Sequence, residues 1–274
     1  MTQNLGYLGP AGSYAEQAAI LYDNDANKVP YPSIPSVVKA VEKFEVSKGL
    51  VPIENSIEGS VTYTLDLLIH DSNLLINDEI ILPIHHNLLS SHGTHKNDIK
   101  AVYSHPQALA QCRKYLENQL PDVELVASLS TSAAVKKLSE ENNVAAIGNL
   151  RAAEIYNAQV IDSEIEDNSN NVTRFVALSE NDSEATGYDK TSICFSFNVD
   201  SPGLLYKVMG FVAEEGINLA KVESRPNKLE LGRYFFLLDL EGHRTDKKIA
   251  STLSAIKNEV SQLKILGSYP QRSL

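Results

Sequence analysis

Over residues 4–179 the chain repeatedly passes from a short apolar run into a helical pattern of apolar side chains. In the first cycle, an apolar run at 4–8 precedes apolar residues spaced i, i+3, i+4 and i+7 from Ala15 to Tyr22. Strands that alternate with helices in this way predict an α/β fold with a mostly parallel sheet and helices on both faces. Since the pattern pauses near residues 80 and 160, we expect two lobes.

The polar stretch 180–189 is the best candidate for a linker, because the pattern changes after it. Strands are expected at 192–199, 217–224, 234–240 and 263–266, with one helical stripe after the first strand and another before the last. The order βαββαβ is the ferredoxin-like layout, so we expect a second, smaller domain here.

Glycine, hydroxyl and amide residues gather where the expected strands pass into helices. The junctions lie at 9–16, 52–60, 104–107, 128–133 and 148–149. Such turns direct free backbone N–H groups to the carboxyl edge of a sheet, so together they predict a site for a small anion, in particular a carboxylate. The same residues are ordinary helix caps and turn formers, and capping alone explains any single junction.

Two further features bear on chemistry. Arg174 enters an expected strand, where it could clamp a carboxylate with two hydrogen bonds or simply lie on an exposed surface. His85 and His86 are adjacent on an extended segment and should point to opposite faces, and His105 at a helix start could bind, donate a proton or cap. Without nearby cysteines or a His-Glu-x-x-His helix, we expect no metal and no cofactor.

Charge and composition exclude several classes of protein. With 24 basic and 35 acidic residues, the net charge is 24 − 35 = −11, which disfavours nucleic acid or anionic membranes as partners. Two cysteines cannot form a disulfide scaffold, and no apolar run approaches the roughly 20 residues of a membrane span. No signal peptide is visible, so we expect a cytoplasmic protein.

The junctions taken together resemble a known family. The matching stretches lie at 6–14, 51–61, 104–112 and 171–175, then at 202–205, 216–219 and 223–226. In this order they are similar to monofunctional prephenate dehydratases with a C-terminal ACT regulatory domain.

The resemblance implies a catalytic domain at 1–182 that is two-lobed like a periplasmic binding protein. Lobe one would comprise 1–77 and 163–182, lobe two 78–162, and the ACT domain 190–270. Because the chain starts at the first strand, we expect no chorismate mutase domain in front of it.

The implied activity is the decarboxylating dehydration of prephenate to phenylpyruvate in L-phenylalanine biosynthesis, without a cofactor. The resemblance also implies feedback regulation by L-phenylalanine and a homodimer or homotetramer. Two alternatives stay open: an arogenate dehydratase, and a non-catalytic protein that binds small acids.

The resemblance implies a role for individual residues. Thr173 would donate to the departing hydroxyl, and Arg174 would clamp a carboxylate or brace its strand. Asn55 would bind the substrate while Glu54 orients the groups around it. The other substrate-binding residues would be Ser13, Ser56, Gln107, Thr131, Ser132, Asn149 and Phe175. The phenylalanine site would be formed by Gly203, Leu204, Leu205, Asn218, Leu219, Glu223, Ser224, Arg225 and Pro226.

Two positions depart from the family pattern. Ala15 lacks a hydroxyl that the family usually has, and Asn149 stands where serine is common. We expect these to change individual hydrogen bonds but not the reaction.

Overall fold

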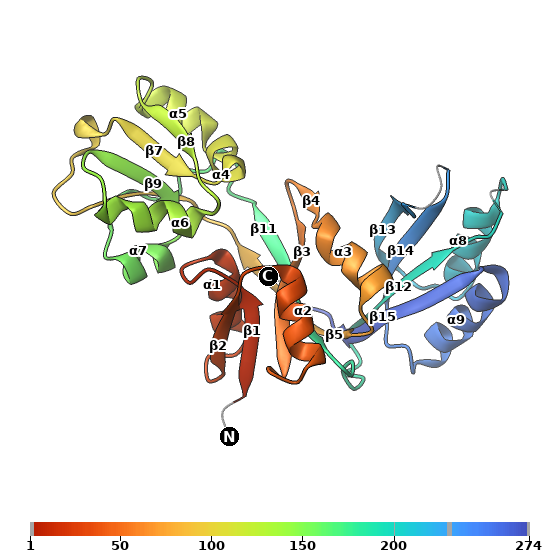
Figure 1. The fold of residues 1–274 in the computed structure, drawn as a ribbon. Coiled ribbons are helices and arrows are strands. Elements are labelled where there is room, and N and C mark those ends of the chain that lie inside the picture. Colours follow the sequence, from red (N-terminus) through yellow and green to blue (C-terminus); the bar gives the residue numbers. More distant parts are fainter. Residues whose placement is uncertain (1–2, 200, 229–231, 273–274) are drawn as a thin grey trace.

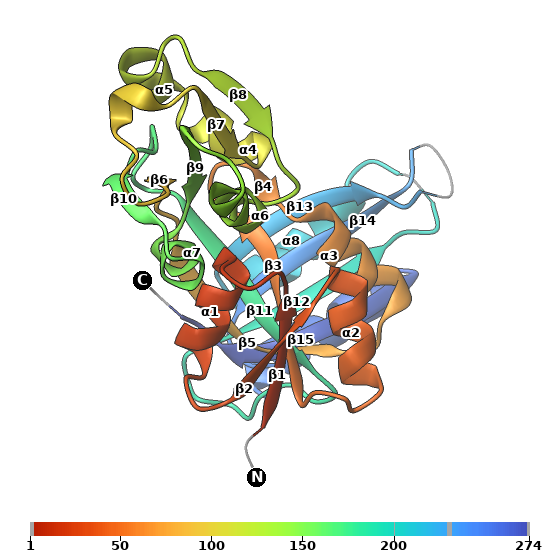
Figure 2. The ribbon, with the colours of Figure 1, turned by 60° about the vertical axis from the view of Figure 1, so that its left-hand side comes forward.

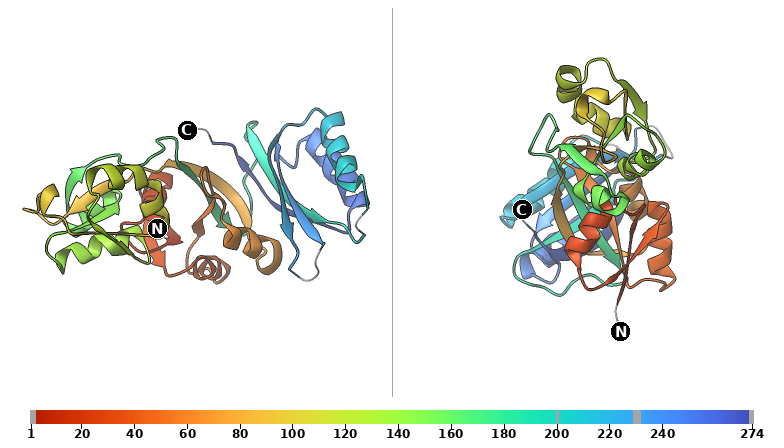
Figure 3. Two further views of the ribbon diagram at one scale, coloured as in Figure 1. Left: turned by 90° about the horizontal axis from the view of Figure 1, so that it is seen from above. Right: turned by 90° about the vertical axis from the view of Figure 1, so that its left-hand side faces the viewer.

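The computed structural model describes residues 3–199, 201–228 and 232–272. Three blocks of structure lie in a row, with lobe one between lobe two and the C-terminal domain (Figures 1 and 3). Within the described ranges, no helix combines the length and the apolar character that crossing a membrane requires.

Lobe one is built on a six-stranded sheet of order β2-β1-β3-β11-β5, with β4 paired to β3. Its strands are β1 (Asn4–Leu8), β2 (Asn27–Tyr31), β3 (Lys48–Asn55), β4 (Gly59–Ser60), β5 (Leu75–Pro83) and β11 (Val172–Ser179). Helix α1 (Tyr14–Tyr22) covers one face. Helices α2 (Ile34–Glu42) and α3 (Thr62–Asp66), the latter continued by a π-helical turn (Leu67–Asp71), cover the other.

Lobe two has a five-stranded sheet of order β10-β6-β9-β7-β8. Its strands are β6 (Asn87–Ser90), β7 (Ala101–Ser104), β8 (Glu124–Ala127), β9 (Val144–Gly148) and β10 (Gln159–Asp162). Helices α4 (Pro106–Gln111) and α5 (Arg113–Gln119) pack on one face. Helices α6 (Thr131–Lys136) and α7 (Leu150–Tyr156) pack on the other.

The two lobes differ from the sequence prediction in strand direction and boundary. Each sheet combines parallel with antiparallel pairs, because the chain crosses between the lobes twice and β11 returns antiparallel to β3 and β5. The expected boundary at residue 78 falls inside β5, which pairs with β11 along its whole length. Lobe two therefore begins after Pro83.

The C-terminal domain has the predicted βαββαβ order. It consists of β12 (Asp189–Ser196), α8 (Leu204–Glu214), β13 (Leu219–Pro226), β14 (Tyr234–Glu241), α9 (Lys247–Glu259) and β15 (Gln262–Pro270), with sheet order β13-β14-β12-β15. Strand alternation explains its two packing faces: Ile193 and Phe195 contact the helices, while Cys194 faces lobe one.

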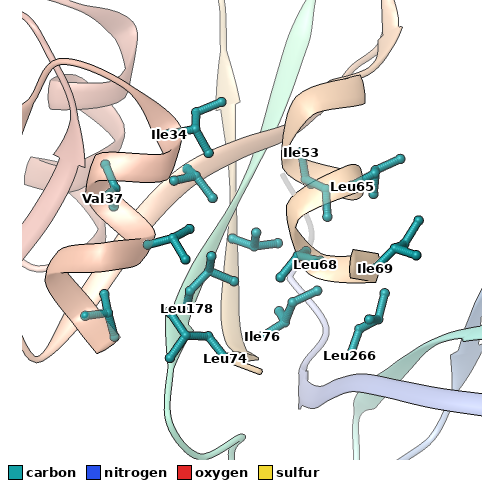
Figure 4. Close-up of a cluster of buried hydrophobic side chains, with 14 of the residues drawn as sticks. Ile34, Val37, Ile53, Leu65, Leu68, Ile69, Leu74, Ile76, Leu178 and Leu266 are labelled. Carbon is teal, nitrogen blue, oxygen red and sulfur yellow. The ribbon is translucent and has the colours of Figure 1, made fainter. Parts of the chain in front are cut away.

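Lobe one and the C-terminal domain share one apolar core. Ile76 and Leu178 of lobe one belong to the same buried cluster as Leu266 of the C-terminal domain (Figure 4). At Gly267, with φ +144°, a Cβ atom would lie 2.2 Å from the backbone oxygen of Ile76. Only glycine allows β15 to approach β5 this closely.

Candidate active site

A cavity of about 280 Å³ lies between the two lobes. Its lining includes Leu8, Gly9, Pro10, Ser13, Tyr14, Ala15, Pro52 and Asn55 of lobe one, and His105, Gln107, Ala108, Gln111, Leu129, Ser130 and Thr131 of lobe two. The segments that connect the lobes add Ile84, His86 and Asn171, and β11 of lobe one adds Thr173 and Phe175. The cavity therefore combines an apolar wall with neutral polar groups from both lobes.

Asn55 and Thr173 lie opposite each other on β3 and β11. The Asn55 side-chain oxygen accepts from the backbone N–H groups of Ile57 and Glu58, both at 3.0 Å, which fixes the orientation of the amide. Its Nδ2 must then be the atom that donates to Thr173 Oγ1, at 2.9 Å. Since Oγ1 accepts this bond, the hydroxyl hydrogen of Thr173 is left for a group in the cavity.

Arg174 and Glu54 lie on the opposite face of the same two strands, outside the lining of the cavity. Of the two roles expected for Arg174, this position favours bracing the strand over clamping a carboxylate. Neighbouring residues of a strand point to opposite sides, so Thr173 and Phe175 face the cavity while Arg174 faces the C-terminal domain. Arg174 and Glu54 pair with each other at 3.4 Å, and Lys221 of β13 pairs with Glu54 at 3.0 Å.

Arg174 is the centre of a buried ionic network. Its guanidinium lies 2.9 Å from Asp239 and 3.3 Å from Glu79, whose side chain has no solvent exposure. Lys190 neutralises Glu79 from the other side at 2.7 Å, and Ser192 donates to Asp239 at 2.6 Å. Arg174 therefore braces the strand that carries Thr173 against the C-terminal domain.

The predicted substrate-binding residues divide into two groups. Ser13, Gln107, Thr131 and Phe175 line the cavity, as does Ala15, one of the two departures from the family pattern. Their part in binding stays a prediction.

The other three, Ser56, Ser132 and Asn149, lie outside the lining and hold backbone instead. Ser56 accepts from the N–H of Val172 at 3.0 Å, and Asn149 caps α7 by accepting from Ala152 at 2.8 Å. Ser132 donates to the carbonyl of Ala11, which joins the lobes where α7 approaches α1 (Figure 2).

Sequence reasoning missed five polar residues of the lining: Tyr14, His86, Gln111, Ser130 and Asn171. Gln111 follows Gln107 by four positions on α4, so helical spacing alone would have placed both on one face. Asn171 precedes Thr173 by two, the spacing of one strand face. His86 points inward and His85 outward, as their adjacency predicts.

The described lining residues of the cavity include no lysine, arginine, aspartate or glutamate. Burial lowers the pKa of His86 and raises that of the Tyr14 hydroxyl, so both side chains are neutral near pH 7. Any anion bound here meets hydroxyl, amide and imidazole groups.

A second, smaller cavity of about 190 Å³ lies in the C-terminal domain. Gly203, Leu204 and Leu205 of the predicted phenylalanine site line it, together with the aromatic rings of Phe197, Tyr206, Tyr234 and Phe236. The site therefore draws on aromatic residues of β14 that the sequence prediction omitted.

The remaining residues of that prediction lie outside this cavity: Asn218, Leu219, Glu223, Ser224, Arg225 and Pro226. Glu223 contacts Ser60, and Arg225 pairs with Asp66 at 2.8 Å, so both side chains face lobe one. Asn218 donates to Glu241 at 2.8 Å. Alternation along β13 directs these charged residues away from the cavity.

Comparison with known proteins agrees with this architecture. A family model described as prephenate dehydratase matches residues 5–183, and one described as ACT domain matches 194–258. The chain is 39% identical over 277 residues to the prephenate dehydratase of Methanocaldococcus jannaschii, covering 98% of this chain and 99% of that one. It is 40% identical over 271 residues to a bifunctional chorismate mutase/prephenate dehydratase of Aquifex aeolicus, covering 98% and 74%.

A solved structure has the same fold. Prephenate dehydratase from Arthrobacter aurescens, determined in complex with L-Phe, superposes with a TM-score of 0.91 at 34% identity, covering 98% of this chain and 90% of that one.

Proposed function

The chain belongs to the prephenate dehydratase family, and on that basis we propose that the cavity between its lobes carries out the reaction of this family. The protein is a carbon–oxygen lyase that converts prephenate to phenylpyruvate. The observation that carries the assignment to this cavity is the Thr173 hydroxyl, which lines the cavity and whose oxygen accepts from Asn55, so that its hydrogen is left for a bound group.

The reaction needs a donor where a hydroxide departs. Breaking the bond to the ring carboxylate releases carbon dioxide and sends its electron pair into the ring, which becomes aromatic as the C–O bond to the hydroxyl breaks. The departing oxygen takes up one proton and leaves as water. In our proposal Thr173 donates to this oxygen and solvent restores the proton; a donor placed where charge develops lowers the barrier by about 3–4 kcal/mol.

The rest of the lining suits the two carboxylates and the ring. Ser13, Gln107 and Thr131 supply donors from both lobes, and Phe175 offers an apolar face beside Thr173. We propose that these four residues bind the substrate, while Arg174 and Glu54 act by holding the strands.

The charge of the lining favours prephenate over arogenate. Arogenate carries an ammonium group where prephenate has a keto oxygen, and the described lining offers no carboxylate to pair with an ammonium. The test is turnover of both substrates by the same preparation, with the phenylpyruvate formed from prephenate read as its enolate absorbance in alkali. A higher kcat/KM for arogenate would reverse the assignment, and turnover of neither would support a binding protein.

Regulation by L-phenylalanine is assigned to the C-terminal domain. The Arthrobacter aurescens relative was determined with L-Phe, and the aromatic cavity at Gly203–Leu205 has the size and character for such a side chain. Calorimetry with L-phenylalanine, and with L-alanine as a control, tests binding, and the prephenate assay tests inhibition. If neither amino acid gives a measurable heat of binding, this site is rejected.

We also propose a homodimer or homotetramer assembled through β13. This strand lies at the edge of its sheet and, within the residues that the structure describes, pairs with β14 alone; Val222 on it is 55% exposed. An unpaired edge is a template for a second copy. Light scattering should give at least twice the chain mass of 30.1 kDa, and Val222→Lys should lower it.

A further inference from the structure

Five side chains of the cavity form one continuous series of hydrogen bonds that ends at Thr173. His86 Nε2 lies 2.9 Å from Gln111 Oε1, which also lies 3.0 Å from Asn171 Nδ2. Asn171 Oδ1 lies 2.8 Å from Asn55 Nδ2, which lies 2.9 Å from Thr173 Oγ1. The chemistry described above uses only the last two members.

The direction of every bond in the series is determined from the Asn55 end. Because backbone N–H groups fix Asn55 with its nitrogen inward, Asn171 must accept with its oxygen and donate with its nitrogen. Gln111 Oε1 is then the acceptor for Asn171, so it can only accept from His86 as well. The imidazole of His86 must therefore carry its hydrogen on Nε2.

The series spans both connections between the lobes. His86 lies between β5 and β6, where the chain first leaves lobe one, and Asn171 lies just before β11, where it returns. Gln111 ends α4 of lobe two. Its single oxygen accepts from both connecting segments, so the alignment of the lobes and the orientation of the Asn55 amide are linked.

We propose that His86 is a positioning residue that, as a neutral Nε2–H donor, holds the Thr173 hydroxyl in its reactive orientation through Gln111, Asn171 and Asn55. This inference rests on the role of Thr173 proposed above. His86 is 2% exposed and Asn171 1%, so solvent does not compete for these bonds.

The neutral form of His86 is consistent with its surroundings. Burial lowers its pKa overall, with the hydrogen bond to Gln111 and the charge of Glu166 acting in the opposite direction and His85 in the same one. Its other ring nitrogen, Nδ1, lies 2.8 Å from the Tyr14 hydroxyl, which also lies 2.7 Å from the carbonyl oxygen of His85. The single hydroxyl hydrogen can be directed to either acceptor, and the Nε2–H form of His86 requires that it be directed to Nδ1. A proton-donating role in the reaction is therefore not needed to explain the environment of His86.

Two substitutions of His86 distinguish a role for its Nε2–H donor from a role for a ring that titrates. The amide nitrogen of glutamine reaches the place of Nε2, whereas that of asparagine reaches only the place of Nδ1, and neither side chain titrates. We expect His86→Gln to keep kcat within about threefold of the parent and His86→Asn to lose about tenfold, with KM little changed in both. His85→Gln is the matched control, because His85 is a neighbouring, half-exposed histidine outside the cavity that pairs with Glu166.

The outcomes are distinct. Equal losses in both His86 variants would show that the titrating ring matters, and equal retention would show that the series does not act on Thr173; either overturns the proposal. A parent without prephenate turnover would overturn the proposed function together with this inference. Nitrogen-15 NMR spectra of the parent give a readout that does not depend on activity or on folding losses in the variants. A spectrum that shows His86 protonated on Nδ1 alone would also overturn the proposal.

Discussion

Replacing Thr173 by valine removes the hydroxyl and keeps the shape of the side chain. Asn55 Nδ2 would lose its bond to Oγ1 but would retain Asn171 Oδ1 at 2.8 Å and the Val172 carbonyl at 3.1 Å as acceptors. No buried donor is left unpaired, so we expect a change in unfolding free energy below about 1 kcal/mol.

The effect on catalysis should be much larger than the effect on stability. A donor removed from a developing charge costs about 3 kcal/mol of transition-state stabilisation, or roughly 150-fold in kcat at about 1.4 kcal/mol per factor of ten. Thr173→Ser keeps the hydroxyl and the bond to Asn55, so it should stay within about tenfold of the parent.

The measurement is prephenate turnover by the enolate absorbance, with urea unfolding of each variant beside it. A valine variant with kcat within fivefold of the parent would remove the hydroxyl from the mechanism. A large loss accompanied by equal destabilisation would attribute the effect to folding.

Three further predictions concern stability. Arg174→Met should destabilise the protein by about 3 kcal/mol in urea unfolding, because buried carboxylates lose their cation. Arg272→Met, which breaks the exposed pair with Asp78, should change the stability by less than about 1 kcal/mol. Equal effects of the two substitutions would contradict the buried network. Burial alone would raise the pKa of Asp66, but Lys228 and Arg225 lower it overall. The contribution of Asp66 to the free energy of unfolding is therefore present above about pH 4 and is lost as the pH falls through the folded-state pKa. The stability difference between the parent and Asp66→Asn should shrink from pH 7 to pH 3, and a constant difference would refute this. Gly267→Ala should destabilise the protein by on the order of 3 kcal/mol, because the new methyl group meets the backbone of Ile76. Gly210→Ala, in α8 with open space around it, should be neutral or slightly stabilising. If alanine at position 267 is tolerated, β15 can move away from β5.

The sequence determined the architecture well because periodicity reports directly on burial. The change from strand–helix cycles to βαββαβ after the linker predicted the C-terminal domain. The boundary of lobe two was wrong because an extended run does not reveal which sheet it joins, and β5 ends only at Pro83.

Individual site residues were harder to predict because one residue type serves several purposes. Asn149 and Ser132 have the features of ligand-binding residues, yet they cap a helix and join the lobes. Arg174 was open to two interpretations, and strand alternation beside Thr173 favours the bracing role. His86 and Gln111 could not be linked from sequence, since their contact depends on how the lobes meet.

The uncharged lining of the cavity has a consequence for how substrate reaches it. A protein of net charge −11 repels an incoming dianion at long range, and no cation at the cavity compensates among the lining residues described. Dissolved salt shortens the reach of that repulsion to about 8 Å at physiological ionic strength while leaving contacts with neutral dipoles nearly unchanged. Capture of prephenate should therefore speed up as salt is added, the reverse of the trend for enzymes that draw anions in with lysine and arginine.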